Sequence, residues 1–256
     1  MNAISIASGS KGNAYCLSSG RTSVLIDCGL ALRELAKRCR QAGVDLGSIC
    51  AVLVTHAHSD HVKGLKTFLS SYDVPVYANM LTAEAIAGGD DAIPGEAFMC
   101  FEDGQQFAVG DFLVEPFSTP HDTADPVGYF VRCGDETYFH GTDIGTPLES
   151  IGRRLAEADV AVLESNHDPL MLDMSGRTRC LIERIRGPRG HLSNGQACEL
   201  VRRYASPRLK RLALAHLSRD CNTPDLAMRA MRGTLEEISR TDIVLSVLSQ
   251  DEAVVL

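Results

Sequence analysis

A group of potential metal ligands lies in the segment Thr55-His56-Ala57-His58-Ser59-Asp60-His61, directly after a continuous apolar run. Neutral imidazole and carboxylate are the usual protein ligands of zinc, manganese and iron. On an extended loop, His56 and His58 can point the same way and bind one ion. Asp60 and His61 can then turn toward a second ion. A lone histidine is usually structural, but this spacing at the end of a buried strand predicts a metal site.

The motif HxHxDH after a hydrophobic strand resembles the metallo-β-lactamase superfamily. Further signatures of that superfamily occur in order, and the resemblance covers residues 4 to at least 225. They are Asp27 in Leu25-Ile26-Asp27-Cys28-Gly29, His121 in Thr119-Pro120-His121-Asp122, Asp143 in His140-Gly141-Thr142-Asp143, and His216 in Leu214-Ala215-His216-Leu217-Ser218. The resemblance implies an α/β protein with the metallo-β-lactamase fold, a four-layer αβ/βα sandwich. It also implies one hydrolase domain over residues 1–256.

Four shorter motifs are similar to those of the YycJ/WalJ branch of this superfamily. They are Ser8-Gly9-Ser10-Lys11-Gly12-Asn13, Glu164-Ser165-Asn166-His167-Asp168, Gly190-His191-Leu192-Ser193-Asn194 and Ala215-His216-Leu217-Ser218. Proteins of that branch are bacterial, cytoplasmic and regarded as DNA exonucleases. The resemblance therefore implies a 5′-to-3′ DNA exonuclease with DNA as its partner.

Carried over onto this sequence, the superfamily pattern implies a site for two divalent ions. The implied ligands are His56, His58 and His121 for the first ion, Asp60, His61 and His216 for the second, and Asp143 between them. Two such ions about 3.5–4 Å apart can share a hydroxide nucleophile and stabilise the attacking and leaving oxygens of a phosphodiester. Asp60 and Asp143 are therefore also candidate catalytic residues. The ligand types suit zinc, manganese and iron alike.

The aspartate at position 143 argues against a β-lactamase. Two-zinc β-lactamases commonly have cysteine at that position, and none of the nine cysteines of this chain falls on a ligand position. His61 completes a ligand set that resembles the nuclease and phosphodiesterase branches. The superfamily pattern thus favours phosphodiester hydrolysis.

His191 is the main candidate for a catalytic residue that is not a ligand. By analogy with superfamily phosphodiesterases, it would protonate the leaving oxygen or hold a phosphoryl oxygen. The turn and cap residues Gly190, Ser193 and Asn194 would present it on a loop before a helix. The alternative is a structural histidine that fixes this turn.

Several other residues are candidates for supporting the ligands or for contacting substrate. We expect Asp27 to hydrogen-bond the ligand loop. His167 follows a predicted strand and either contacts substrate or supports the site by pairing with Asp168 or Glu164. The loop 8–13 either forms a hairpin turn or brings Lys11 and its backbone N–H groups to a phosphate.

The elements that must position these residues alternate between short strands and helices. Apolar runs predict strands at 4–7, 14–17, 24–26, 49–54, 74–77, 112–117, 127–132, 137–139, 159–163, 212–215, 243–247 and 253–256. Helical spacing predicts helices at 30–41, 62–70, 82–87, 148–156, 193–204 and 225–239. This alternation indicates sheets covered by helices.

Composition is that of an ordinary globular protein, with 256 residues, 45% hydrophobic and 23% charged. Tryptophan is absent and aromatic residues are 5%, so we expect an aliphatic core. No apolar run reaches about 18 residues, so we expect no membrane span, and we interpret the N-terminal residues as carrying no signal peptide. The nine cysteines are odd in number and lack a CxxC pair, which favours reduced thiols and a cytoplasmic location.

Positive charge is concentrated in one segment of an acidic chain. Ten basic and two acidic residues lie between Gly176 and Arg211, so this segment carries +8 and the remaining residues carry −8 − 8 = −16. Such a segment favours a polyanion on one face. Two solvated, arginine-rich helices would explain the charge equally well.

Two other functions stay open on the sequence alone. The same metal pair would serve a hydrolase of small phosphodiesters, thioesters or other esters. A metal-binding regulatory protein without catalysis is the third hypothesis, although an intact ligand set argues against it. Protein partners and oligomeric state are unknown from the sequence.

Overall fold

The computed structural model describes residues 1–89, 92–102 and 104–256, and the chain divides into two compact units. Unit 1 comprises Met1–Ser118, Thr123–Asp135 and Ser249–Leu256, and unit 2 comprises Thr119–Asp122 and Glu136–Leu248. Both units are assembled from separated stretches of the chain. The expectation of one domain over residues 1–256 stays a prediction.

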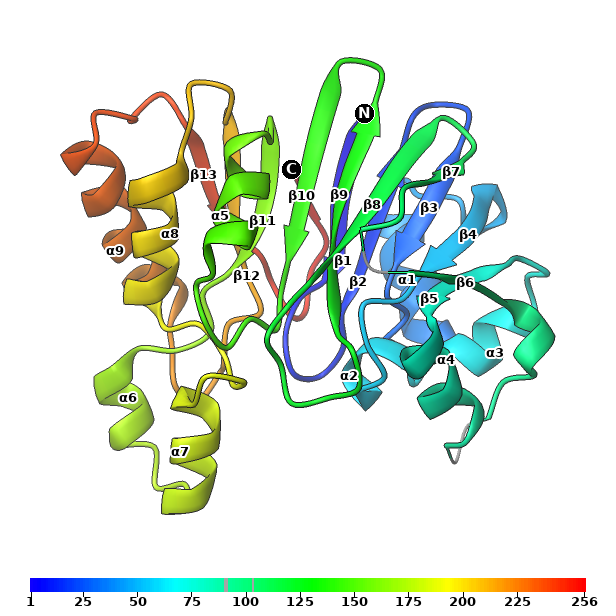
Figure 1. Ribbon diagram of the computed structural model, residues 1–256, viewed down its shortest axis with the longest axis horizontal. Coiled ribbons are helices and arrows are strands. Elements are labelled where there is room, and N and C mark those ends of the chain that lie inside the picture. The colour runs from blue at the N-terminus through cyan, green and yellow to red at the C-terminus, as the bar shows by residue number, and fades with distance from the viewer. Residues whose placement is uncertain (90–91, 103) are drawn as a thin grey trace. The chain divides into compact units, whose positions relative to one another are not determined.

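Unit 1 contains a sheet of seven strands (Figure 1). In sheet order they are β14 (Val254–Val255), β1 (Asn2–Ala7), β2 (Ala14–Ser18), β3 (Ser23–Ile26), β4 (Ile49–Leu53), β5 (Val76–Asn79) and β6 (Phe98–Phe101). Strands β14, β1, β2 and β3 pair antiparallel, whereas β3 to β6 pair parallel. Because parallel strands end at the same edge, Asp27 after β3 and the loop after β4 lie at one edge of this sheet.

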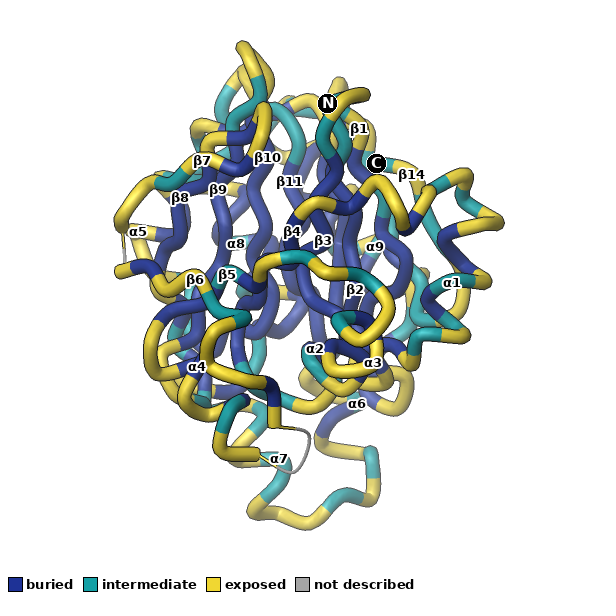
Figure 2. Tube along the Cα trace, turned by 90° about the vertical axis from the view of Figure 1, so that its right-hand side faces the viewer, coloured by how far each residue is buried: buried dark blue, intermediate teal, exposed yellow. Residues whose placement is uncertain are grey.

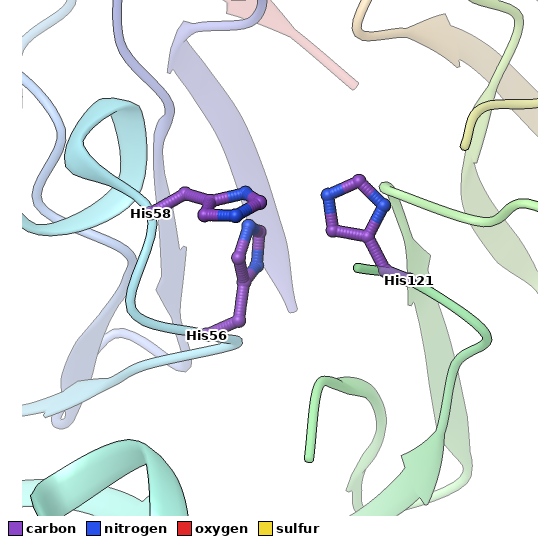
Figure 3. A group of neighbouring side chains, drawn as sticks. All are labelled: His56, His58 and His121. Carbon is purple, nitrogen blue, oxygen red and sulfur yellow. The ribbon is translucent and has the colours of Figure 1, made fainter. Parts of the chain in front are cut away.

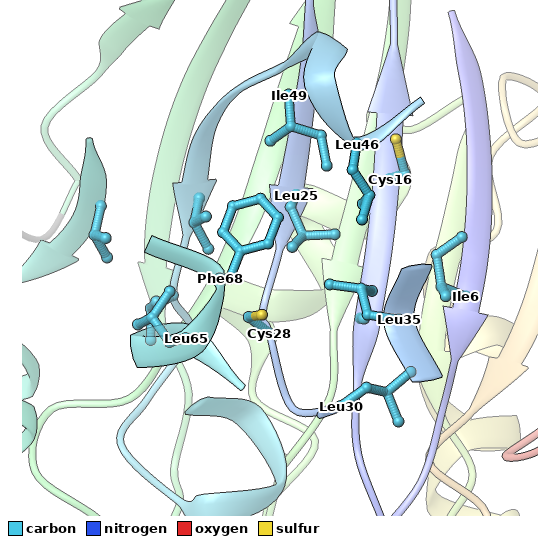
Figure 4. Close-up of a cluster of buried hydrophobic side chains, with 14 of the residues drawn as sticks. Ile6, Cys16, Leu25, Cys28, Leu30, Leu35, Leu46, Ile49, Leu65 and Phe68 are labelled. Atoms are coloured by element: carbon cyan, nitrogen blue, oxygen red, sulfur yellow. The ribbon is translucent and has the colours of Figure 1, made fainter. Parts of the chain in front are cut away.

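Helices cover unit 1's sheet and bury a mainly aliphatic cluster (Figure 4). The expectation of an aliphatic core is met only in part, because Tyr15, Phe112 and Tyr129 of unit 1 are also fully buried. The helices are α1 (Leu32–Gln41), α2 (Ser59–Val62), α3 (Leu65–Leu69) and α4 (Met80–Ala87). Leu35 of α1 and Phe68 of α3 are fully buried against strand residues such as Leu25 and Val52. The strands are buried along most of their length (Figure 2). The remaining strands of unit 1, β7 (Phe107–Val109), β8 (Phe112–Ser118) and β9 (Val127–Cys133), pair antiparallel.

Unit 2 is a parallel α/β unit. Its strands are β10 (Glu136–Gly141), β11 (Val160–Glu164), β12 (Arg211–Ala215) and β13 (Val244–Val247), paired in this order. Its helices are α5 (Glu149–Ala156), α6 (Pro169–Asp173), α7 (Arg179–Arg186), α8 (Asn194–Tyr204) and α9 (Pro224–Glu237). Helix α8 packs against α5 and α9, while α6 and α7 extend away from the strands (Figure 1).

The predicted strands and helices are present, and the errors have physical causes. The helix predicted at 62–70 is divided, because Val62 ends α2 and α3 begins at Leu65. Between them the Gly64 N–H donates to the Cys28 carbonyl at 2.9 Å and not to the preceding helical turn. Strands β6 and β7 were not predicted, since β6 is partly exposed and β7 has three residues. Helices α6 and α7 were not predicted, because with five and eight residues they are shorter than the stretch of about 11–18 residues over which an apolar period is counted. Among the described residues, no helix has the length and apolar character needed to cross a bilayer.

We predict that Leu35→Ala destabilises the protein, because Leu35 is fully buried in the core of unit 1. The cavity should lower the free energy of unfolding by about 2–5 kcal/mol in urea denaturation. Leu81→Ala, at a side chain that is 51% exposed, is the matched control and should change it by less than about 0.5 kcal/mol. Equal effects of the two substitutions would contradict this assignment of the core.

Candidate metal centre

Unit 1 contributes a loop of three histidines and one aspartate directly after β4. The rings of His56 and His58 lie edge to face with centroids 4.8 Å apart, and those of His56 and His61 are 4.0 Å apart. Figure 3 shows the first pair from the side, together with His121, which belongs to unit 2. Asp60 and His61 lie on the one-turn helix α2 that ends this loop. Four potential ligands are thus held within one short stretch of unit 1.

Asp27 fixes the orientation of this loop from the end of β3. Its fully buried carboxylate accepts hydrogen bonds from the backbone N–H of Thr55 at 2.9 Å and from the Thr55 hydroxyl at 2.9 Å. It also lies 2.7 Å from Nδ1 of His61. Because an ionised carboxylate only accepts, Nδ1 carries the proton and Nε2 is the nitrogen with the lone pair.

Asn13 also contacts the ligands of unit 1, and sequence reasoning did not single it out. Its Nδ2 lies 3.0 Å from Nε2 of His61 and 3.3 Å from Oδ2 of Asp60. Its backbone N–H donates to the Asp60 carbonyl at 2.8 Å. Asn13 ends the loop 8–13, which joins the antiparallel strands β1 and β2 as a hairpin connection. Lys11 is exposed on this loop, and its carbonyl accepts from the Lys63 ammonium.

Unit 2 contributes His121, Asp143 and His216. Asp143 Oδ1 lies 3.6 Å from Nε2 of His121 and 3.5 Å from Nδ1 of His216. Nδ1 of His121 lies 3.0 Å from the Gly190 carbonyl oxygen, so this nitrogen is a donor and Nε2 is the basic one. All three side chains are buried. Two of the predicted ligands, His121 and His216, therefore lie beside one carboxylate oxygen of the third, Asp143.

Glu164, at the end of β11, connects the residues of unit 2, whereas the sequence indicated it only as a candidate partner of His167. Its fully buried carboxylate lies 2.8 Å from Nδ1 of His191 and 3.0 Å from Nδ1 of His216. Its second oxygen accepts from the backbone N–H groups of Ile144 at 2.9 Å and Leu192 at 3.0 Å. The detectable signal was an acidic residue that ends a buried apolar strand.

Charge within this group shifts the protonation of Glu164 and His191. Burial alone would raise the pKa of Glu164, but the charge of His191 and hydrogen bonds from His191 and His216 outweigh it and lower the pKa to about 2. Burial alone would lower the pKa of His191, yet the charge and hydrogen bond of Glu164, together with Asp143, raise it. Each group of this pair therefore favours the charged form of the other.

His61, His121 and His216 share one arrangement that fits a divalent metal. Each has its Nδ1 beside a carboxylate or a carbonyl oxygen, which leaves Nε2 as the basic nitrogen. Metal-ligating histidines characteristically donate their other ring N–H in this way. In unit 2, ligand atoms of Asp143, Glu164, His191 and His216 also lie within 4.8 Å of one another. The donor set of each unit, imidazole with carboxylate, thus suits a divalent cation.

Backbone strain marks the same positions. Asp27, Asp143 and His216 have φ angles of 60°, 57° and 55°, a region that residues other than glycine seldom adopt. Asp27 directly follows β3, Asp143 closely follows β10 and His216 directly follows β12. Such conformations persist where the surrounding structure holds them, and they cluster at functional sites.

Comparison with known proteins identifies the family of this chain. A family model described as the beta-lactamase superfamily domain matches residues 22–216. The chain belongs to the metallo-β-lactamase superfamily. Exodeoxyribonuclease YycJ of Bacillus anthracis is 34% identical over 232 residues, which are 91% of this chain and 88% of that protein. Exodeoxyribonuclease WalJ of Streptococcus pneumoniae D39 is 29% identical over 244 residues, 94% of this chain and 90% of that protein.

A solved structure has the same fold as this chain. The metallo-β-lactamase fold protein YhfI of Bacillus subtilis has a TM-score of 0.71 at 15% identity, with all of both chains covered. The predicted fold class, the α/β metallo-β-lactamase fold, is therefore confirmed. The superfamily is hydrolytic, and with the histidine and aspartate groups described above the chain is a metal-dependent hydrolase.

The other predicted residues of this metallo-β-lactamase-superfamily enzyme have structural partners. Ser193 caps α8 in a capping box with Gln196, so the expected presentation of His191 before a helix is observed. Asn194 bonds Asn222 at 3.0 Å and accepts from Ser165 at 2.6 Å. Burial lowers the pKa of His167 to about 4, so this ring is neutral at pH 7. The roles of these residues toward substrate stay predictions.

Most basic side chains of segment 176–211 form ion pairs with acidic side chains of unit 2. The basic residues with an acidic partner are Arg177, Arg179, Arg184, Arg186, Arg202, Arg203, Arg208 and Lys210. They lie mainly on or beside α7 and α8. Solvated arginine-rich helices therefore explain much of this charge, and its concentration alone does not identify a polyanion site.

We predict that Glu164→Gln lowers both stability and metal affinity. The glutamine NH2 group would face either the two imidazole Nδ1–H groups or the backbone N–H groups of Ile144 and Leu192. The free energy of unfolding should fall by about 3 kcal/mol in urea, and metal affinity by about 10–100-fold in a chelator competition assay. Glu157→Gln, at the exposed partner of Arg154, is the control and should change neither quantity measurably. Wild-type behaviour of Glu164→Gln would show that this carboxylate does not order the histidines.

We predict a contribution of His167 to the pH dependence of stability. The folded-state pKa of about 4 lies below the ordinary value of 6.5 because the ring is buried. Between these pH values the unfolded chain binds a proton that the folded chain does not, so the free energy of unfolding falls as pH decreases. Between pH 7.5 and pH 5, the free energy of unfolding should fall by about 1–2 kcal/mol less in His167→Gln than in the wild type. Urea denaturation at the two pH values measures this difference. Identical losses in the two proteins would contradict a neutral, buried His167.

Proposed function

We propose that this enzyme is a metal-dependent phosphodiesterase that removes nucleotides from DNA ends, as a 5′-to-3′ exodeoxyribonuclease. The observation that carries the hydrolytic chemistry is the shared arrangement of His61, His121 and His216, each with Nδ1 engaged and Nε2 basic. The substrate is supported by the two exodeoxyribonuclease relatives, whose similarity extends over at least 91% of this chain. A cytoplasmic location belongs to the same proposal, since a DNA exonuclease must meet its substrate.

The superfamily pattern leads us to propose two divalent ions, zinc, manganese or iron. The residues that would hold them are His56, His58 and His121 for the first, Asp60, His61 and His216 for the second, and Asp143 for both. When bound, such ions supply Lewis acidity at phosphate and lower the pKa of water toward neutrality. The residues of this chain orient the ligands, and Asp27 and Glu164 do so through the Nδ1 atoms of His61 and His216.

His191 is the proposed proton donor to the leaving oxygen. It lies on the loop between α7 and α8, with Nδ1 2.8 Å from Glu164. This bond fixes the ring and makes Nε2 the nitrogen that reaches the substrate. Glu164 stays ionised and stabilises the charged imidazole, so the proton is held at His191 until the ester bond breaks.

A hydrolase of small phosphodiesters or thioesters is the second candidate, and one observation favours it. The basic segment 176–211 is largely neutralised by acidic side chains of unit 2, as described above. The net charge of −8 would also repel a polyanion such as DNA. Efficient hydrolysis of bis(p-nitrophenyl) phosphate with no cleavage of any DNA would support this candidate.

We predict that Asp143→Asn and His191→Ala abolish or strongly reduce cleavage of end-labelled linear DNA in the presence of Mn²⁺ or Zn²⁺. Loss of a proton donor typically costs a factor of about 10²–10⁴ in rate. Label should be lost first from the 5′ end of a linear duplex, while a closed circle stays intact. Comparing 5′-labelled with 3′-labelled strands tests the polarity. Full activity of both variants would contradict the mechanism, and degradation of the circle would contradict an exonuclease.

A further inference from the structure

An arm of unit 2 connects two of the proposed active-site residues. Residues 169–190 contain α6 and α7, begin five positions after Glu164 and end directly before His191. We call residues 169–190 the α6–α7 arm. In Figure 1 its two helices extend away from the strands of unit 2. The sequence between two site residues is thus used to build a projecting element.

The root of the arm is fixed against the site residues of unit 2. Arg189 Nε donates to the His121 carbonyl at 2.9 Å, and the Gly190 carbonyl oxygen lies 3.0 Å from His121 Nδ1. Pro188 accepts from the Thr146 hydroxyl at 2.8 Å. A Cβ on Gly145 would lie 2.4 Å from the Pro188 oxygen, so the two backbones are in close contact. The arm therefore leaves the His121 and His191 region in a defined direction.

The outer part of the arm exposes apolar side chains. Leu170 is 73% exposed and Met174 is 85% exposed, and α7 has no buried residue. The apolar residues of α7, Leu181, Ile182 and Ile185, are only half-buried, so this helix is not packed into a core of the chain. Exposed leucine and methionine on a projecting element are typical of a contact with another molecule.

The arm is basic in an acidic chain. Its five arginines and two acidic residues give +3, whereas the remaining residues carry −8 − 3 = −11. Arg179 is 92% exposed in its side chain and pairs with Glu183 one turn away at 2.8 Å. An exposed pair of this kind contributes about 0–1 kcal/mol, so a phosphate can replace the glutamate at little cost. Arg177 and Arg184 pair with Asp220 and Asp122 outside the arm, so Arg179 and Arg186 are the arginines that the arm offers to a phosphate backbone.

We propose that the α6–α7 arm binds the end of the DNA substrate, with arginines on the backbone and with Leu170 and Met174 against the terminal bases. This inference rests on the proposed exonuclease function. Apolar side chains of this kind unstack base steps in other protein–DNA complexes. Helix α7 has eight residues and is about 12 Å long, which spans about three to four base pairs. The arm therefore contacts the few nucleotides nearest the scissile bond.

The basic part of the arm is tested with Arg179→Gln/Arg186→Gln. The matched control is Arg153→Gln/Arg154→Gln on α5, where exposed arginines pair with Glu149 and Glu157 in the same local way. Binding is measured by fluorescence anisotropy with the metal-loaded enzyme on a duplex whose ends carry phosphorothioate linkages. We expect the arm variant to bind at least 5-fold more weakly and with a smaller salt dependence, and the control to bind as the wild type does. Equal weakening by both variants would overturn the proposal, because it would indicate a general charge effect.

The apolar part of the arm is tested with Leu170→Ser/Met174→Ser and 2-aminopurine at the terminal position of the duplex. Binding of the wild type should raise 2-aminopurine fluorescence by unstacking, and the variant should lose most of this increase. Leu113→Ser/Val244→Ser, at exposed apolar side chains outside the arm, is the control and should retain it. If both arm variants bind DNA, raise 2-aminopurine fluorescence and cleave DNA as the wild type does, the arm proposal is overturned and the exonuclease proposal stands. A wild type that neither binds nor cleaves DNA but hydrolyses bis(p-nitrophenyl) phosphate would overturn the exonuclease function and the arm proposal together.

Discussion

Two buried carboxylates determine how the histidines of this protein are presented. Asp27 in unit 1 and Glu164 in unit 2 are both fully buried, and each accepts from backbone N–H groups as well as from imidazole. The backbone donors compensate part of the cost of burying the negative charge. The imidazole donors fix one tautomer and one ring orientation. The ligand geometry of each unit thus depends on a carboxylate that need not touch a metal itself.

The same construction explains why strained backbone is tolerated at Asp27, Asp143 and His216. Each follows a strand of a parallel pair, at the point where the chain leaves the sheet. A left-handed conformation at a residue other than glycine costs on the order of 1 kcal/mol. Hydrogen bonds within each unit hold these residues in the strained conformation. The strain lowers stability locally, and it fixes the direction in which the side chains point.

Much of this organisation was predictable because it is carried by local patterns. The continuous apolar run at 49–54 and the HxHxDH motif predict a buried strand followed by ligands, and β4 and its loop have this form. The contacts of Asn13, and those of Glu164 with His191 and His216, were missed for a different reason. These contacts include pairs 47 and 52 positions apart in the chain, and no spacing rule reports such pairs. Helix α7 was missed although Leu181, Ile182 and Ile185 recur at helical spacing, because eight residues are too few to show a sustained apolar period.

The C-terminal strand has a consequence for the order of folding during synthesis. Strand β14 pairs with β1, Leu256 donates its N–H to Ala3, and Arg38 of α1 donates to the Gln250 carbonyl at 2.6 Å. Unit 1 is therefore completed only by residues translated after the whole of unit 2. Until they emerge from the ribosome, β1 presents an unpaired edge to other chains. A nascent chain of this enzyme would depend on rapid closure, or on a chaperone, during the interval in which unit 2 is being translated.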